Sequence, residues 1–227
     1  MKTVSFTDQK IRGGVHMAKM QEITVWTRGV VMDKEGRDIA NAFARAAAME
    51  GKHVQSFDDY EDLPDRVNVT TRKYIRISDE EIAMKYIYAV EHPDAVVVAE
   101  ESIIKGIDIL RGMKEGGLLL INSARDIDYL LKFIPDAGVL GAVATVDAKG
   151  ISGVSTIDFS GSEGGVDSAG IGAGIAAPIV GALAKVTGMA KKENLAKVVA
   201  DVSGMERGYK EVKVKKLKPR AEYAWSA

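Results

Sequence analysis

Short apolar runs alternate with segments of helical periodicity over most of this chain. The first run, at 23–26, is followed by a segment from about Gly36 to Glu50 in which apolar residues recur at i, i+4, i+7 and i+8 from Ile39. This spacing predicts a helix with one buried face. A further strand is expected at 53–57. Strand, helix and strand together predict a βαβ unit with a right-handed crossover.

The same alternation continues downstream. Ala95–Val98 is a continuous apolar run, which is typical of a central parallel strand covered on both faces. The further predicted strands are 73–77, 117–121 and 142–146, and the further predicted helices are about 103–112, 127–133, 175–187 and 193–202. Strands alternating with helices in this way favour an α/β fold with an open, mostly parallel sheet and helices on both faces.

The organisation predicted from these elements is a single domain at 21–210, preceded by an N-terminal arm at 1–20. A Lys-rich C-terminal tail follows at 211–227. A glycine-rich stretch at 161–174 interrupts the alternation. It is much longer than a dinucleotide-binding turn, so we expect it to be a lid or a segment packed against a partner.

Composition narrows the class of protein. Of the 227 residues, 46% are apolar and 28% charged, as in ordinary globular proteins. The net charge of -1 argues against nucleic acid as the main partner, because phosphate contacts require a basic surface. No apolar run has the length of a membrane span or a signal peptide. We therefore expect a cytoplasmic protein without a membrane partner.

Cysteine is absent from the chain, which excludes disulfides and thiolate-bound zinc or iron–sulfur clusters on this chain. The three histidines, His16, His53 and His92, lack metal-ligand spacing, so no metal site is expected. They also give no recognisable arrangement with a serine and an aspartate. No self-contained set of catalytic residues is therefore predicted.

The loop expected at 27–35 is the first candidate binding site, because ligands of doubly wound sheets bind beyond the carboxyl ends of the strands. Arg28 and Gly29 would place a guanidinium and a backbone N–H beside a phosphate at the helix N-terminus. The G-x-G-x-x-G pattern is missing, however, and Asp33 and Glu35 add negative charge. A charged solvent loop is the alternative interpretation.

Two further positions follow predicted strands. Arg66 and Arg72 come after the strand at 53–57 and an acidic loop. They either pair with that loop at the surface or bind an anion or a partner. Asn122 directly follows a buried strand, where it either contacts a ligand or caps the next helix.

Several ordered segments resemble the gamma subunit, or gamma domain, of the 2-oxoacid:ferredoxin oxidoreductases, the pyruvate synthase family. The resemblance spans about 22–212 and rests on Trp26–Gly29, Ala44–Lys52, Arg76–Glu80, Pro93–Val98, Met113–Ser123, Val143–Ala148, Gly181–Gly188 and Arg207–Tyr209. It implies a Rossmann-like sheet packed against alpha-, beta- and delta-type subunits. Those partners would hold thiamine diphosphate, Mg and 4Fe–4S clusters, with ferredoxin or another acceptor taking the electrons.

The implied reaction is the oxidative decarboxylation of a 2-oxoacid, usually to an acyl-CoA and carbon dioxide, with the chain inactive alone. The resemblance implies that the gamma part supports assembly and the coenzyme A side of the site. Residues at matching positions are Arg28, Gly29, Gly36, Arg66, Arg72 and Asn122. Alternatives are a free-standing nucleotide- or coenzyme-binding module and a purely structural scaffold subunit.

The first loop departs from the family's pattern. The family reads R-G-G-Q-G, whereas this chain has about three extra residues between Gly29 and Gly36 and lacks the middle Gly-Gln. The later F-G-P-E-R-R-G-A-P segment keeps Pro64, Arg66 and Arg72 but has Val67 and Asn68 in place of the second Arg and the Gly. These changes predict altered or absent coenzyme A binding, and an aryl-2-oxoacid (phenylglyoxylate-like) or oxalate enzyme.

Overall fold

The computed structural model describes residues 20–59, 69–83, 89–153 and 174–217. The strands are β1 Gln21–Arg28, β2 His53–Asp58, β3 Thr70–Ser78, β4 Ala95–Val98, β5 Gly117–Asn122, β6 Leu140–Val146 and β7 Lys213–Lys216. The α-helices are α1 Gly29–Ala48, α2 Ile127–Leu131, α3 Ala148–Ser152, α4 Ala176–Thr187, α5 Lys192–Leu195 and α6 Val202–Glu211. Two 3-10 helices, η1 Glu101–Lys105 and η2 Ala137–Val139, complete the described elements.

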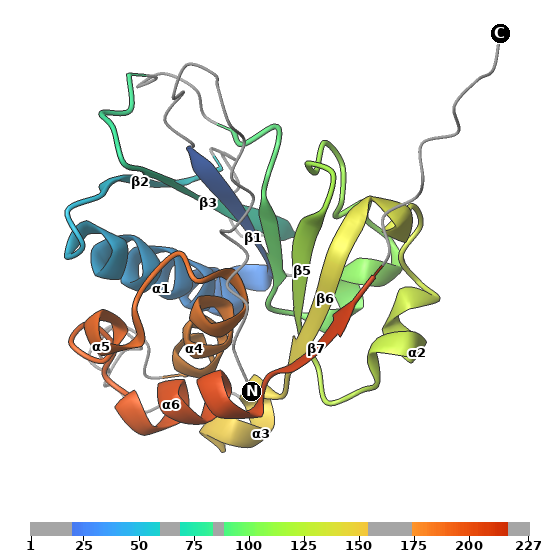
Figure 1. The fold of residues 1–227 in the computed structure, drawn as a ribbon. Helices are drawn as coiled ribbons and strands as arrows, with labels where there is room; N and C mark the ends of the chain where they lie inside the picture. The colour runs from blue at the N-terminus through green and yellow to red at the C-terminus, as the bar shows by residue number, and fades with distance from the viewer. Residues whose placement is uncertain (1–19, 60–68, 84–88, 154–173, 218–227) are drawn as a thin grey trace, which may run out of the picture.

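The described strands form one sheet in the order β2-β3-β1-β4-β5-β6-β7 (Figure 1). The central strands β1, β4, β5 and β6 are parallel neighbours, whereas β3 and β7 run antiparallel to theirs. Five of the seven described strands therefore point the same way. The predicted α/β fold with a mostly parallel sheet is confirmed.

Strand β3 is the main difference from the predicted βαβ unit. Strands β1 and β2 run in the same direction, but β3 lies between them and pairs antiparallel with both. All eight residues of β1 pair with β3, so β1 reaches its parallel neighbour β4 only on its other side. Helix α1 therefore connects two strands that are not adjacent.

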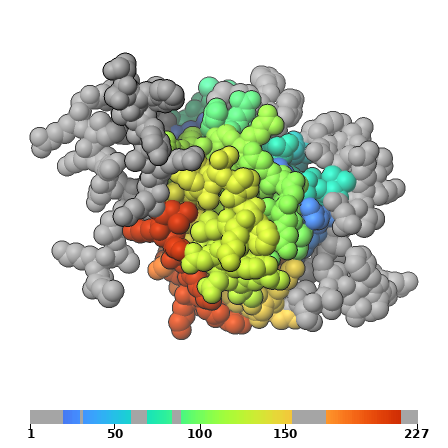
Figure 2. Space-filling view, turned by 90° about the vertical axis from the view of Figure 1, so that its right-hand side faces the viewer, coloured from blue at the N-terminus to red at the C-terminus, as the bar shows by residue number. Residues whose placement is uncertain are grey.

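The two faces of the sheet are covered differently. Helices α1, α3, α4, α5 and α6 lie on one face, called the first face, and α2 lies on the opposite, second face (Figure 1). The side that carries α2 faces the viewer in Figure 2. Ile23 and Val25 of β1 join the core under α1 and α4. Val96 and Val98 of β4 join a smaller core with Leu130 of α2. Strand β4 is thus buried on both faces, as its apolar run predicts.

Close helix packing on the first face depends on two glycines. A Cβ atom at Gly181 of α4 would lie 2.0 Å from the carbonyl oxygen of Met205, and one at Gly208 of α6 would lie 2.0 Å from that of Pro178. The backbones of α4 and α6 therefore approach closer than any larger residue allows. None of the described helices has the length and apolarity needed to cross a membrane.

Three predicted helices have the wrong bounds. Helix α1 begins at Gly29, not at Gly36. The helix predicted at 103–112 is wrong, because only the 3-10 helix η1 forms there. The helix predicted at 193–202 is also wrong. Helix α5 ends at Leu195, and α6 begins at Val202, where the Asp201 side chain accepts a hydrogen bond from the Gly204 N–H.

Part of the predicted C-terminal tail belongs to the sheet. Residues 213–216 form β7, which pairs antiparallel with β6 between Lys213–Thr145 and Lys216–Ala142. Strand β7 is the edge strand next to β6, and its lysines are consistent with an edge that resists further strand pairing. The predicted N-terminal arm lies outside the described residues, apart from Met20.

Candidate functional site at the carboxyl edge of the sheet

The parallel strands β1, β4, β5 and β6 end side by side at one edge of the sheet, called here the carboxyl edge. After β1 the chain enters α1 on the first face, whereas after β4 it enters η1, whose Ile103 and Ile104 pack on the second face. The connections therefore diverge between β1 and β4. Such a point is where open α/β sheets bind ligands.

Arg28, at the end of β1, spans this divergence. Its Nη1 atom donates a hydrogen bond to Oγ of Ser102 in η1, at 3.0 Å. Its Nε atom is buried and has no hydrogen-bond partner in the structure. The bond from Nη1 fixes the side chain, while Nε keeps a donor without a partner. Such an arginine is suited to binding an anion or a partner.

Gly29 starts α1 and has a left-handed backbone, with φ of 76°. This conformation favours glycine, and it lets the helix follow β1 without a connecting loop. Its N–H was expected beside a phosphate, but it donates a hydrogen bond to the carbonyl oxygen of Val69 at 2.8 Å. The loop predicted at 27–35 is therefore wrong, and this N–H is occupied.

Gly36 lies about two turns inside α1 and faces the sheet. A Cβ atom there would lie 2.6 Å from Cγ2 of Thr27 and 3.3 Å from Cγ of Lys73. The absence of a side chain lets α1 pack directly on β1 and β3. Gly36 therefore serves helix–sheet packing and does not lie at the mouth of a phosphate loop.

Asn122, at the end of β5, is buried and fully bonded. Its Nδ2 atom donates to the carbonyl oxygen of Ala99 at 2.9 Å, and its Oδ1 atom accepts from the N–H of Ala148 at 3.0 Å. The side chain ties the end of β4 to the start of α3. Asn122 therefore does not cap the next helix, α2, as the alternative interpretation had it; it bonds the start of α3, and both amide atoms already have protein partners.

Arg72 lies in β3 and points to the second face, away from the packed helices. Its Nε atom donates to Oδ2 of Asp59 at 2.7 Å, and its guanidinium carbon lies 5.2 Å from the Trp26 ring centroid and 5.9 Å from that of Tyr74. Pairing with the acidic loop and stacking on aromatic rings thus hold Arg72 in place. Arg66 lies outside the described residues.

The acidic residues expected to repel an anion are turned away from solvent. Asp33 accepts hydrogen bonds from Lys73 Nζ at 2.7 Å and Thr71 Oγ1 at 2.9 Å. Burial alone would raise the pKa of Asp33, but these bonds and the Lys73 and Arg37 charges hold it below its ordinary value of 3.8. Lys73 is itself buried and also contacts Asp58 at 3.2 Å.

Glu35 connects α1 to α4. Its Oε2 atom accepts a hydrogen bond from the N–H of Ala176, at the start of α4, at 2.8 Å. Burial raises the pKa of Glu35 above 4.5, and the backbone N–H of Ala176 opposes that rise only in part. Both carboxylates thus stabilise the packing of α1.

Sequence reasoning missed the polar residues that follow β4. Ser123 Oγ donates to Oε2 of Glu101 at 2.6 Å, and Arg125 pairs with the same carboxylate at 3.1 Å. Lys149 pairs with Glu100 at 3.0 Å. The pair Glu100-Glu101 joins the ends of β4, β5 and β6. Their position directly after a buried strand was the available signal.

The carboxyl edge can bind an anion through Arg28 but carries no evident catalytic set. Within the part of the chain that the structure describes, no group of three or more His, Asp or Glu side chains is placed to hold a metal ion. The serines there already hydrogen-bond to Glu101 or Arg28. Chemistry at this edge would therefore need groups beyond the described residues.

Comparisons with known proteins agree with this picture. Residues 38–213 match the family model described as pyruvate ferredoxin/flavodoxin oxidoreductase. The pyruvate synthase subunit PorC of Thermotoga maritima is 30% identical over 191 residues, covering 78% of this chain and 88% of that protein. The common gamma subunit of the pyruvate/ketoisovalerate oxidoreductases of Thermococcus litoralis is also 30% identical, over 77% of this chain and 83% of its own length.

Solved structures give the same result. The crystal structure of pyruvate oxidoreductase subunit PORC from Thermotoga maritima aligns with a TM-score of 0.65 at 29% identity, covering 87% of this chain and 99% of that one. A 2-oxoglutarate:ferredoxin oxidoreductase from Magnetococcus marinus, 16% identical, shares the fold with a TM-score of 0.53, and this chain covers 31% of it.

The fold and these relatives define an α/β domain of the kind found in subunits of 2-oxoacid oxidoreductases. The chain belongs to the pyruvate ferredoxin/flavodoxin oxidoreductase family, and within it to the gamma-type subunits.

Proposed function

We propose that this chain is the gamma-type subunit of a multi-subunit 2-oxoacid oxidoreductase that depends on thiamine diphosphate and iron–sulfur clusters and is inactive without its partners. The observation that carries the proposal is that, among the described residues, the site offers Arg28 with an unused donor and forms no catalytic set. The gamma-type relatives, which this chain matches over most of their length, support it. Alpha-, beta- and delta-type subunits would supply the rest.

The cofactors would be divided among chains. This chain has no cysteine, so it offers no thiolate for a 4Fe–4S cluster. Thiamine diphosphate with Mg would supply the carbanion chemistry of 2-oxoacid decarboxylation, and the clusters would pass electrons to ferredoxin or another acceptor. The role left to this chain is assembly and the positioning of a second substrate.

We further propose that any contact with coenzyme A is made by Arg28 and not by a backbone phosphate loop. The N–H of Gly29 and both amide atoms of Asn122 have protein partners, so these predicted contacts are already occupied. Of the predicted residues that the structure describes, Arg28 has a buried donor without a partner. A guanidinium can pair with a phosphate without help from the backbone.

The altered first segment also supports an unusual substrate. The residues between Gly29 and Gly36 form two turns of α1, with Asp33 and Glu35 engaged in packing. An aryl-2-oxoacid or oxalate is therefore proposed ahead of pyruvate. A panel of these acids, with pyruvate as reference, separates the cases by kcat/KM in the assembled enzyme.

Arg28→Ala in the assembled complex tests the role of this subunit. We expect the KM for coenzyme A to rise about tenfold or more, the loss of one charge-assisted contact, with a smaller change in kcat. Arg45→Ala, an exposed arginine on α1, is the matched control and should change neither constant. Unchanged kinetics for Arg28→Ala in an intact complex would favour the scaffold role instead.

A further inference from the structure

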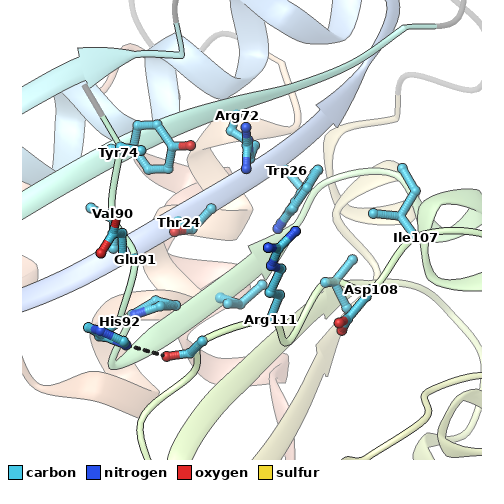
Figure 3. A pocket seen from close by; sticks show the side chains of 15 residues that line it. Thr24, Trp26, Arg72, Tyr74, Val90, Glu91, His92, Ile107, Asp108 and Arg111 are labelled. Atoms are coloured by element: carbon cyan, nitrogen blue, oxygen red, sulfur yellow. Dashed lines mark hydrogen bonds between the residues drawn. The ribbon is translucent and has the colours of Figure 1, made fainter. Parts of the chain in front are cut away.

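A pocket of about 660 Å³ opens on the second face of the sheet, where none of the described long helices covers β1 and β3 (Figure 3). Its floor is formed by Thr24 and Trp26 of β1 and by Arg72 and Tyr74 of β3. Its walls come from residues 89–93 and 107–112, which lead into β4 and β5. This volume lies in the range of small-molecule sites, about 300–1,000 Å³.

The pocket is separate from the carboxyl edge. The wall segments 89–93 and 111–112 precede β4 and β5, so they lie toward the amino ends of these strands. Arg28, Gly29 and Asn122 do not line it. A ligand here would therefore contact residues that the proposed coenzyme A contact does not use.

Two polar atoms on the floor have no partner. Thr24 is 5% exposed, and its Oγ1 atom makes no hydrogen bond to any described residue; the same is true of the buried Nε1 atom of Trp26. A buried polar group without a hydrogen bond costs about 1–3 kcal/mol. A fold that retains two of them side by side on one strand offers hydrogen bonds to a bound acceptor.

One positive charge in the pocket is also available. Arg72 is paired with Asp59, but Arg111, an exposed residue on the wall, makes no ion pair or hydrogen bond through its side chain within the described residues. Arg72 and Arg111 both line the pocket, and the guanidinium carbon of Arg72 lies 5.2 Å from the centroid of the Trp26 ring (Figure 3).

The remaining charges of the lining disfavour a ligand with two negative charges. Glu91 and Asp108 are exposed members of the lining, and the Oδ1 atom of Asp108 accepts from the Leu110 N–H at 3.2 Å. His92 donates from Nδ1 to the Gly112 carbonyl oxygen at 3.1 Å. With Arg72 neutralised, the free charge of Arg111 faces two carboxylates. A dianion would meet more repulsion here than a monoanion.

We infer that this pocket binds a flat, aromatic monocarboxylate. Its ring lies against Trp26, Tyr74 and the aliphatic lining, and guanidinium planes suit stacking as well as pairing with a carboxylate. Its carboxylate pairs with Arg111 and receives hydrogen bonds from the floor. The site is independent of the function proposed above, because it needs only this chain.

Calorimetric titration of the full chain with 2-naphthoate, 2-naphthamide and 2-naphthyl phosphate tests the inference. We expect 2-naphthoate to bind with a Kd below about 1 mM, and the neutral amide and the dianionic phosphate to bind at least tenfold more weakly. Arg111→Gln should weaken 2-naphthoate binding about tenfold or more, whereas Arg45→Gln should leave it unchanged.

The indole N–H resonance of Trp26 locates the bound ligand. The chain has two tryptophans, so Trp225→Phe leaves a single indole signal, which 2-naphthoate should shift. Thr24→Val should weaken binding without loss of thermal stability, because the hydroxyl it removes has no partner. Absence of binding, equal binding of the amide, tighter binding of the phosphate, or an unmoved Trp26 signal would each overturn the inference.

Discussion

The two faces of the sheet differ in how closely helices pack on them and in whether their polar side chains have hydrogen-bond partners. On the first face, α1, α4 and α6 pack so closely that glycines are required at the contacts, and Asp33, Glu35 and Lys73 all have partners. On the second face, the pocket over β1 and β3 keeps unpaired atoms at Thr24 and Trp26. The difference separates the part of the molecule that stabilises the fold from the part available for binding.

The carboxyl edge resembles the first face more than the second, because most of its described polar side chains have partners. Asn122 and the Glu100-Glu101 pair are tied to neighbouring elements, whereas Arg28 keeps a buried donor that has no partner among the described residues. A polar residue after a buried strand therefore does not by itself mark a ligand site. In this chain, such residues mainly join the ends of strands that the loops would otherwise leave apart.

The largest expected effect breaks the first face. Gly208→Val would drive a side chain into the carbonyl oxygen of Pro178, so α4 and α6 must separate. We expect a loss of about 3 kcal/mol in the free energy of unfolding, measured with urea. Gly106→Ala, where a Cβ atom meets nothing within 4 Å, is the control and should cost little. Equal effects of the two changes would contradict close helix packing.

A smaller effect tests the carboxyl edge. Asn122→Ala leaves the Ala99 carbonyl and the Ala148 N–H without partners, and we expect it to lower the free energy of unfolding by about 2 kcal/mol. The control Asn41→Ala removes only an exposed bond to Ser56 and should change it by less than about 0.5 kcal/mol. A stable Asn122→Ala protein would show that this residue is not needed for the fold.

Glu35 gives a pH-dependent test of the first face. Burial raises its pKa in the folded protein above 4.5, so the folded state holds this proton more tightly than the unfolded state does. Its contribution to stability is complete below pH 4.5 and is lost as the pH rises through the raised folded pKa. Glu35→Gln should therefore gain stability relative to the wild type across that window. The same trend in the exposed variant Glu193→Gln would assign it to net charge instead.

The smallest expected effect concerns the second face. Thr24→Val replaces a buried, unbonded hydroxyl with a methyl group of similar size. We expect the thermal midpoint to stay level or rise, and the free energy of unfolding to increase by at most about 1 kcal/mol. The contrast with Asn122→Ala sharpens the comparison, since both residues are buried and polar. A clear loss of stability in Thr24→Val would mean that the hydroxyl has a structural partner.

Local pattern predicted much of the fold. Strand β4, Ala95–Val98, was predicted with the bounds it has, because a short apolar run between turn residues is typical of a buried strand. The helix predicted from Ile103 failed because Gly106 interrupts it, and the Asp108 side chain bonds the Leu110 N–H and favours a turn. The N-cap residue Asp201 was a readable start signal for α6.

The sites were less predictable, because they depend on distant contacts. Gly29 and Gly36 were chosen for a phosphate loop, but their roles come from Val69 and Thr27, which pattern alone does not place beside them. Strand β3 inserts between β1 and β2, and this brings Arg72 next to Trp26. No periodicity within either segment shows that pairing.

Purification of the tagged chain from cells that also express its natural partners tests the central claim, that this is a subunit whose chemistry is completed by other chains. We expect the chain to elute in a complex much larger than 24.4 kDa. This complex should contain bound thiamine diphosphate and iron, and it should reduce an acceptor when a 2-oxoacid is added. The claim is contradicted if the chain elutes alone at 24.4 kDa and the active fraction, with the thiamine diphosphate and iron, lacks it.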